Sequence, residues 1–177
     1  MIADWKTGRG VHCLSQGEAL WYYVLRWDDT NEDIREQFPL DMPEVDRIAD
    51  EMGIARPKSP NFVMTTDFLV TKSDGKLVAY SVKNDRNLTK RTLELLCVEK
   101  AYWLSKGIPF ELLFKEDVNR IFATNIRLVT EFYDKNKVFD ELSNWKHLIA
   151  TKQIEYDMEK EIITVDKIRK LIFKQED

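Results

Sequence analysis

The sequence has too few cysteines and histidines for the commonest crosslinks and metal clusters. Its two cysteines, Cys13 and Cys97, stand too far apart to suggest a disulfide framework. Its two histidines, His12 and His147, have no spacing that is typical of a zinc site. We therefore expect a reduced, cytoplasmic protein without a zinc centre.

Long hydrophobic runs are also absent. No apolar stretch approaches the roughly 20 residues that a membrane helix requires, so no membrane partner is expected. The first ten residues, MIADWKTGRG, lack the apolar stretch of a secretory signal. What the 177 residues do contain, 44% hydrophobic and 33% charged, is the composition of one globular domain with a proper core and room for a small appendage.

An excess of positive charge is lacking as well. The formal net charge of −4 argues weakly against a protein that coats nucleic acid through its overall field. The charges are nevertheless uneven, since residues 28–51 carry ten acids against two bases, whereas residues 83–91 carry four bases and one acid. The acidic segment is either a solvated face or a surface for a protein partner. The basic segment is either a solvated helix start or a local phosphate-binding patch.

Hydrophobic periodicity and turn residues predict alternating helices and strands. In chain order we expect a helix at 15–27, a strand within EDIREQFPL at 32–40, a short helix at 41–52, a hairpin at 64–83, a helix at 88–106, a strand within IPFELLF at 108–114, a helix at 117–134, and helices near 138–150 and after 164. The continuous apolar run IPFELLF is typical of a strand that is covered on both faces. This order predicts an α/β domain with a mixed central sheet flanked by helices.

The hairpin in residues 64–85, MTTDFLVTKSDGKLVAYSVKND, allows two registers. A two-residue loop within KSDGK would oppose Asp67 to Val82. A three-residue loop, with Gly75 in the left-handed position, would oppose Asp67 to Ser81. Opposed residues share a face of the sheet because side chains alternate with period two.

We expect the three-residue loop because it gathers the polar groups on one face. Asp67, Ser81 and Lys83 then project to the same side, whereas a lone charge on the core face would be costly. The plainest interpretation of this arrangement is a salt bridge between Asp67 and Lys83 at the end of the sheet.

The same order of an aspartate, a hairpin and X-x-Lys is also the core of the PD-(D/E)XK nuclease fold. A strand-borne carboxylate such as Asp67, with the Val82 backbone carbonyl, offers the oxygen ligands that Mg²⁺ and Mn²⁺ prefer. Lys83 would position and deprotonate the attacking water and offset charge on the phosphate. Glu18 is placed to add an acid from the N-terminal helix, although Ser15 and Glu18 also match a helix capping box. The pattern by itself recurs by chance in many α/β proteins.

A much more specific resemblance runs through residues 9–130. The chain resembles the TnsA-type endonuclease subunits of heteromeric cut-and-paste transposases, which belong to the PD-(D/E)XK superfamily. The resemblance is carried in one collinear block by LSQGEALWYYVLRW, DIREQFPL, TTDFLV, VKND, RTLELLCVEKAYWLSKGIPF and NIRLV. DIREQFPL is a signature of that family.

The resemblance implies a restriction-endonuclease-like core and a set of site residues. Glu18 and Asp67 would be metal ligands together with the Val82 carbonyl, and Lys83 would be the catalytic lysine beside these two acids. The cofactor would be Mg²⁺, with Mn²⁺ as a substitute. Ser81 departs from the family, which often has glutamine there, and as a weaker uncharged ligand it leaves one or two metal ions open.

The resemblance also implies a function and partners. The chain would be a Mg²⁺-dependent endonuclease that hydrolyses one strand at the 5′ ends of a mobile element, in a bacterial or phage-encoded system. Its partners would be double-stranded DNA of the transposon ends, a DDE-type transposase and an AAA+ regulator. Arg86, Lys90 and Arg91 would bind DNA phosphates. A non-catalytic assembly subunit and a stand-alone phage or defence nuclease remain alternatives.

The expected domain organisation follows the same resemblance. Residues 1–134 would form the endonuclease domain. Residues 135–177 would form a short, mainly helical C-terminal extension, where members of the family usually carry a larger helical domain that meets the AAA+ regulator and DNA.

Overall fold

The computed structural model describes residues 1–55 and 63–173. The helices in these ranges are α1 (Gln16–Trp27), α2 (Met42–Glu51), α3 (Lys90–Ser105), α4 (Arg120–Thr130), the short 3-10 helix η1 (Lys135–Lys137), α5 (Glu141–Ala150) and α6 (Val165–Phe173). The strands are β1 (Ile2–Ala3), β2 (Gly10–Val11), β3 (Asn31–Pro39), β4 (Thr65–Lys72), β5 (Leu77–Lys83) and β6 (Phe110–Phe114). None of the helices in the described ranges has the length and apolar character that a membrane crossing demands.

The ends of the helices follow local capping chemistry. The Ser15 hydroxyl accepts a hydrogen bond from the Glu18 backbone N–H at 3.1 Å and so begins α1, and Thr89 caps α3 in the same way. Gly53 and Gly107 adopt left-handed φ values of 66° and 70° just after α2 and α3. Only glycine takes this conformation without steric cost, so the helices end where the sequence predicts.

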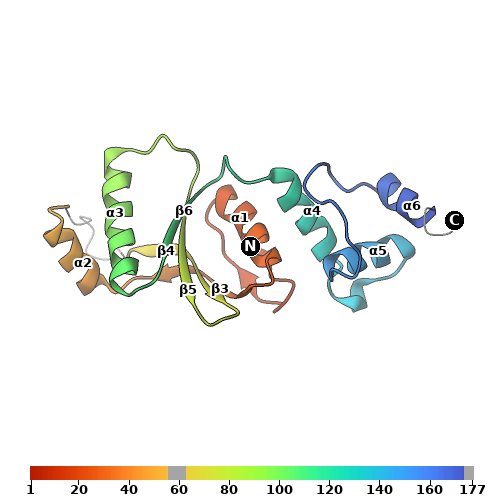
Figure 1. The fold of residues 1–177 in the computed structure, drawn as a ribbon, viewed down its shortest axis with the longest axis horizontal. Coiled ribbons are helices and arrows are strands. Elements are labelled where there is room, and N and C mark those ends of the chain that lie inside the picture. Colours follow the sequence, from red (N-terminus) through yellow and green to blue (C-terminus); the bar gives the residue numbers. More distant parts are fainter. Residues whose placement is uncertain (56–62, 174–177) are drawn as a thin grey trace. The chain divides into compact units, whose positions relative to one another are not determined.

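The central sheet is mixed, as predicted. Its strand order is β3-β4-β5-β6, with β3 and β5 antiparallel to β4, and β6 parallel to β5. The parallel pair is joined through α3, because parallel neighbours need a crossover connection. Figure 1 shows α2 and α3 on one side of this sheet.

The expectation that IPFELLF forms a strand covered on both faces is wrong. β6 lies at the edge of the sheet, its Glu111 is exposed, and its other four residues are only partly buried. An apolar run signals burial but does not reveal how completely other elements cover each face of the strand. Among the described strands, β6 pairs with β5 alone.

The core of the sheet lies between the hairpin and the two helices α2 and α3. Leu69 of β4 and Ala79 of β5 are buried against apolar side chains of both helices. The other buried members of this cluster are Leu40, Val45, Ile48, Ala49, Met64, Val98, Tyr102 and Trp103. Burial of side chains of this size contributes roughly 1.5–3 kcal/mol each, so the cluster holds α3 firmly behind β4 and β5.

The register of the hairpin is the predicted one. Phe68 opposes Tyr80 and Thr71 opposes Leu77, so Asp67 stands opposite Ser81. Gly75 has a φ of 79° and donates its N–H to the Lys72 carbonyl at 2.9 Å, as the three-residue loop requires. The loop chemistry thereby determines which polar groups meet at the far end of the hairpin.

The chain divides into two compact units. The sheet unit contains His12–Ala19 and Asp28–Asp117, and the helical unit contains Met1–Val11, Leu20–Trp27 and Val118–Asp177. Helix α1 contributes its first turn to the sheet unit and the remainder to the helical unit. The functional boundary expected after residue 134 stays a prediction, because compactness alone does not test it.

The helical unit has a core of its own, made by α4, α5, α6 and the loop before α6. Ile126, Val129, Ile149 and Ile168 are among its buried members. Asn125 is completely buried and fully hydrogen-bonded, since its amide nitrogen donates to two loop carbonyls and its oxygen accepts the Ile163 N–H, each at 2.8 Å. A buried amide is tolerated only when it is paired in this way, so Asn125 anchors the loop to α4.

Candidate active site

Glu18 is brought to the sheet by the first turn of α1. A Cβ atom at the preceding Gly17 would lie 3.1 Å from Lys115 Cβ and 3.3 Å from Val82 Cγ1, so only glycine permits this close approach without a shift. Glu18 Oε2 accepts the Leu14 backbone N–H at 2.8 Å. The predicted capping box is therefore half formed. The serine caps the helix, but the glutamate bonds one residue before the cap, which leaves its carboxylate turned toward β3 and β4.

Asp67 lies at the meeting point of β4, β5 and β3. Its Oδ2 accepts the Val82 N–H at 2.6 Å and lies 3.4 Å from Ser81 Oγ. Its Oδ1 accepts a hydrogen bond from Gln37 Nε2 at 3.4 Å. The side chain is 16% exposed, so the carboxylate is neither fully buried in the core nor fully solvated.

Lys83 stands beside Asp67, as predicted. Its Nζ lies 3.7 Å from Asp67 Oδ2, 3.0 Å from Ser81 Oγ and 3.1 Å from the Val82 carbonyl oxygen. The salt bridge that the sequence suggested is therefore present, but it is a loose one in which the ammonium group has three different partners. The Val82 carbonyl oxygen, a predicted metal ligand, thus accepts a hydrogen bond from the same ammonium group.

Gln37 is a site residue that the sequence interpretation missed. Its amide nitrogen donates to Glu18 Oε2 at 3.1 Å as well as to Asp67. Its backbone φ of 48° is left-handed, which is uncommon for a residue other than glycine or asparagine. Gln37 lies within DIREQFPL, but a polar residue in an alternating strand looks like an ordinary solvent-facing position, so only its membership of that signature could have indicated it.

Glu99 of α3 is a second residue that was missed. Glu99 is 3% exposed, and its carboxylate accepts a hydrogen bond from Thr66 Oγ1 at 2.8 Å. Burial raises the pKa of Glu99 to about 7, and the negative charge of Asp67 adds to this effect. The sequence did contain an indication that Glu99 is buried, because it lies on the same helix face as the apolar residues Leu96 and Trp103, three and four positions away.

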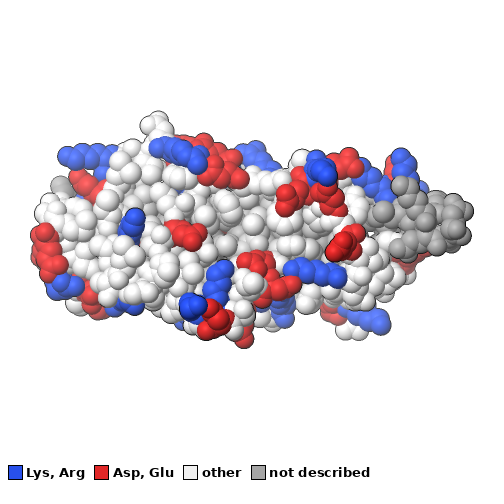
Figure 2. Space-filling view, in the orientation of Figure 1, with Lys and Arg blue, Asp and Glu red and all other residues white. Residues whose placement is uncertain are grey.

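Of the predicted DNA-binding bases, Arg86 and Lys90 are exposed and Arg91 is half-buried, and all three lie next to acids. Arg86 forms ion pairs with Glu116 and, at 2.7 Å, with Asp117. Arg91 pairs with Glu94 at 3.1 Å, and Lys90 lies 3.9 Å from the same carboxylate. On the face drawn in Figure 2, acidic and basic side chains are interspersed rather than separated into fields of one sign. Any phosphate contact by these bases must therefore compete with existing ion pairs.

The donor atoms present fit a divalent cation, although the set is small. Within residues 1–55 and 63–173, no group of three or more His, Cys, Asp and Glu side chains is close enough to hold a metal ion. Two carboxylate oxygens nevertheless lie close to each other, since Glu18 Oε2 and Asp67 Oδ1 accept hydrogen bonds from one amide nitrogen at 3.1 and 3.4 Å. Hard oxygen donors of this kind are the ligands of Mg²⁺ and Mn²⁺.

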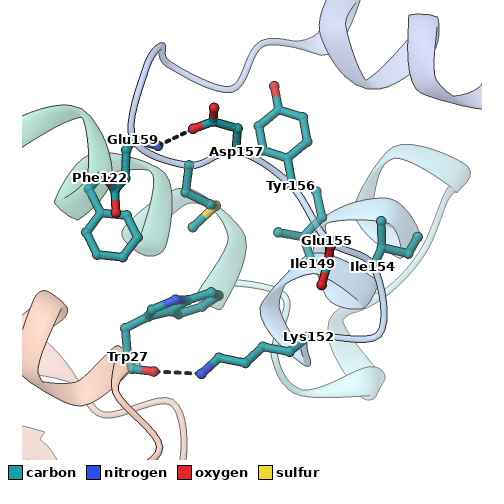
Figure 3. A pocket seen from close by; sticks show the side chains of 10 residues that line it. Trp27, Phe122, Ile149, Lys152, Ile154, Glu155, Tyr156, Asp157 and Glu159 are labelled. Atoms are coloured by element: carbon teal, nitrogen blue, oxygen red, sulfur yellow. Dashed lines mark hydrogen bonds between the residues drawn. The ribbon is translucent and has the colours of Figure 1, made fainter.

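A hollow of about 780 Å³ lies elsewhere, in the helical unit, and none of the candidate site residues lines it. Figure 3 shows Trp27, Phe122 and Tyr156 around it, with Lys152 donating to the Trp27 carbonyl at 2.8 Å. Asp157 at its rim is paired with Lys160 at 2.6 Å. The hollow is distinct from the site on β4 and β5, and we assign it no part in the chemistry.

The raised pKa of Glu99 predicts that it destabilises the protein at neutral and higher pH. The folded protein holds this proton up to about pH 7, whereas the unfolded chain releases it near 4.5. The tighter binding of this proton by the folded protein therefore stabilises it fully below pH 4.5, and this contribution to the free energy of unfolding is lost as the pH rises through 7. Glu99→Gln should therefore be more stable than the wild type at pH 8, by on the order of 2–3 kcal/mol, and nearly equal to it at pH 5.

Urea unfolding at both pH values, in metal-free buffer, measures this difference. Glu94→Gln, a half-exposed position on the same helix, is the matched control and should show no such pH dependence. Parallel stability curves for the wild type and Glu99→Gln would contradict the prediction.

Comparison with known proteins agrees with the geometry. Residues 28–115 match the family described as TnsA-like endonuclease N terminal. This segment includes Gln37, Asp67, Lys83 and Glu99, whereas Glu18 precedes it. The chain is also 40% identical, over 159 residues, to the transposon Tn7 transposition protein TnsA of Escherichia coli. The aligned region covers 85% of this chain and 58% of that relative. The chain thus spans less than two thirds of the length of the relative that it matches. On these two findings, the chain belongs to the TnsA-like endonuclease family.

Proposed function

We propose that this chain is a metal-dependent DNA endonuclease subunit of a heteromeric transposase, which hydrolyses one strand at the 5′ ends of a mobile element. One observation carries the proposal: Glu18, Asp67 and Lys83 come from three different elements and converge on one partly open site. The mixed sheet, with the acid on β4 and the lysine on β5, supports a restriction-endonuclease-like core.

Glu18 and Asp67 would hold the divalent cation, together with the Val82 carbonyl. The cation would be Mg²⁺, for which Mn²⁺ can substitute, and when bound it supplies a Lewis acid beside the scissile phosphate. Ser81 is uncharged and already bonded to Lys83 at 3.0 Å, so it is a poor further ligand. The nearby acid is Glu99, but its carboxylate is buried behind Ser81 and bonded to Thr66.

Lys83 would act directly on the reacting groups. Its ammonium group lies at the edge of the site, 27% exposed, where it can orient the attacking water and stabilise the negative charge that develops on the phosphate. The interaction of this positive charge with the phosphate is stronger there than in bulk water, because the neighbouring strands exclude much of the solvent. Asp67 and the Val82 carbonyl hold the ammonium group in place.

The proposed macromolecular partners are double-stranded DNA of the element ends, a DDE-type transposase for the 3′ ends, and an AAA+ regulator. Arg86, Lys90 and Arg91 would contact phosphates beyond the site. Because these bases are already paired with acids and the net charge is −4, the isolated protein should bind DNA weakly at physiological salt. Ser81 is the observation that favours the second candidate, a non-catalytic assembly subunit with a decayed site.

Strand-specific cleavage tests the proposal. End-labelled duplexes from the element ends are incubated with Mg²⁺ and the protein, with and without the cognate transposase. We expect little nicking by the protein alone and a sharp increase of 5′-end cleavage with the transposase. Robust, indiscriminate cutting by the isolated protein would instead indicate a stand-alone nuclease, and no cleavage under any condition would indicate the assembly subunit.

A further inference from the structure

One side-chain amide stands between the two carboxylates of the candidate site. Gln37 Nε2 donates to Glu18 Oε2 at 3.1 Å and to Asp67 Oδ1 at 3.4 Å. The register explains the second contact, because Glu36 opposes Phe68 and Phe38 opposes Thr66, so Gln37 lies across from Asp67 on the neighbouring strand. The amide therefore links the helix-borne acid to the strand-borne acid.

The orientation of this amide is determined by its partners. Carboxylates only accept hydrogen bonds, so the NH₂ group must face them. The amide oxygen is held on the other side, where it accepts the Thr65 hydroxyl at 3.1 Å. Both polar atoms of the Gln37 amide are thus hydrogen-bonded, which fixes the side chain against its partners in α1 and β4.

The backbone at Gln37 is strained in order to reach this position. Its φ of 48° is left-handed, a conformation that is costly for a residue other than glycine. Nothing in the turn chemistry requires this conformation, because Gln37 lies inside β3. The strain is offset only if the side chain gains enough from the contacts with Glu18, Asp67 and Thr65.

We propose that Gln37 is a positioning residue that holds Glu18 and Asp67 together as a pair ready to bind a divalent cation. Two neighbouring carboxylates repel each other, the more so because Glu18 is only 6% exposed and the Asp67 side chain only 16%. The Gln37 NH₂ group carries partial positive charge toward both and offsets that repulsion. This inference rests on the proposed function of the same site, since it assigns the pair a cation.

Loss of the Gln37 amide should therefore lower metal affinity and not only the stability of the fold. Without the amide, Glu18 and Asp67 would separate, and binding a cation would require them to be brought back. Removing a group that orients metal ligands typically lowers metal affinity by about 10- to 100-fold. A merely structural glutamine would lower the melting temperature and leave metal affinity unchanged.

Two substitutions separate the side chain from the backbone strain. Gln37→Ala keeps the strained φ without the amide, whereas Gln37→Gly removes both the amide and the strain. We expect both variants to bind Mn²⁺ about 10- to 100-fold more weakly than the wild type by titration calorimetry or electron paramagnetic resonance, with Gln37→Gly the more stable of the two. Gln16→Ala, at an exposed position near the start of α1, is the control and should bind Mn²⁺ like the wild type.

A thermal-melting cycle in metal-free buffer tests the same inference without any cation. If the amide offsets repulsion between the two acids, the melting temperature lost in Gln37→Ala should be smaller in a Glu18→Gln background, by about 2–4 °C. Wild-type Mn²⁺ affinity in both Gln37 variants would overturn the positioning role, and so would additive melting temperatures in the cycle. A wild type that binds no Mn²⁺ while the cycle shows coupling would instead refute the proposed nuclease and leave the link between the acids standing.

Discussion

Asp67→Asn is expected to abolish strand cleavage in the presence of the partner transposase, while the protein stays folded. Asparagine has nearly the same shape, and its side-chain oxygen can still accept the Val82 N–H that Asp67 accepts at 2.6 Å. It lacks the negative charge that attracts a cation, and its NH₂ group would meet the NH₂ group of Gln37. Cleavage should therefore fall to background, and Mn²⁺ binding should be lost with it.

The measurement is 5′-end cleavage of labelled duplexes, with melting curves and Mn²⁺ titration on the same samples. Asp74→Asn is the matched control, because it makes the same change in the loop of the same hairpin, away from the site. It should cleave at the wild-type rate. Wild-type cleavage by Asp67→Asn would refute the metal-ligand role of Asp67 and the nuclease mechanism with it.

Lys83→Ala is expected to lower cleavage by about 100-fold or more, with little effect on stability. Removing one group that stabilises developing charge typically has this effect on rate. The structural cost should be small, since a partly exposed ion pair such as the 3.7 Å contact to Asp67 contributes about 0–1 kcal/mol. DNA binding and Mn²⁺ affinity should stay close to those of the wild type.

Single-turnover cleavage with saturating transposase, beside melting curves, measures both effects. Lys76→Ala removes an exposed lysine from the loop of the same hairpin and serves as the control. If Lys83→Ala cuts at the wild-type rate but melts much lower, Lys83 is a structural partner of Asp67, and the assembly-subunit interpretation gains support.

Local chemistry made most of the fold predictable. The loop KSDGK allowed only two registers for the hairpin, and the cost of a lone charge on the core face selected the one that places Asp67, Ser81 and Lys83 together, which the structure confirms. The start of α1 followed from Ser15, whose hydroxyl caps a free backbone N–H group. These features depend on residues close together in the chain, where sequence spacing and spatial distance are nearly the same.

The incomplete predictions concern contacts between distant segments. IPFELLF was expected to be covered on both faces, yet Glu111 of β6 is exposed and the other four residues are only partly buried, since hydrophobicity does not specify how completely each face of a strand is covered. The basic residues after β5 looked available to phosphates, but Arg86 meets acids that lie about 30 residues further along the chain. A charge count along the sequence does not show which partners the fold supplies.

By itself, the sequence determined the mixed α/β class, the register of the hairpin and the two strand-borne residues Asp67 and Lys83, because loop geometry and strand periodicity act over a few residues. Only the tertiary structure decided what surrounds them. Gln37 reaches both acids through a strained backbone in β3, and Glu99 approaches from α3, buried behind Ser81. A polar residue in a strand or on a helix face has many possible partners, and the free energy that selects one of them comes from packing between elements far apart in the chain.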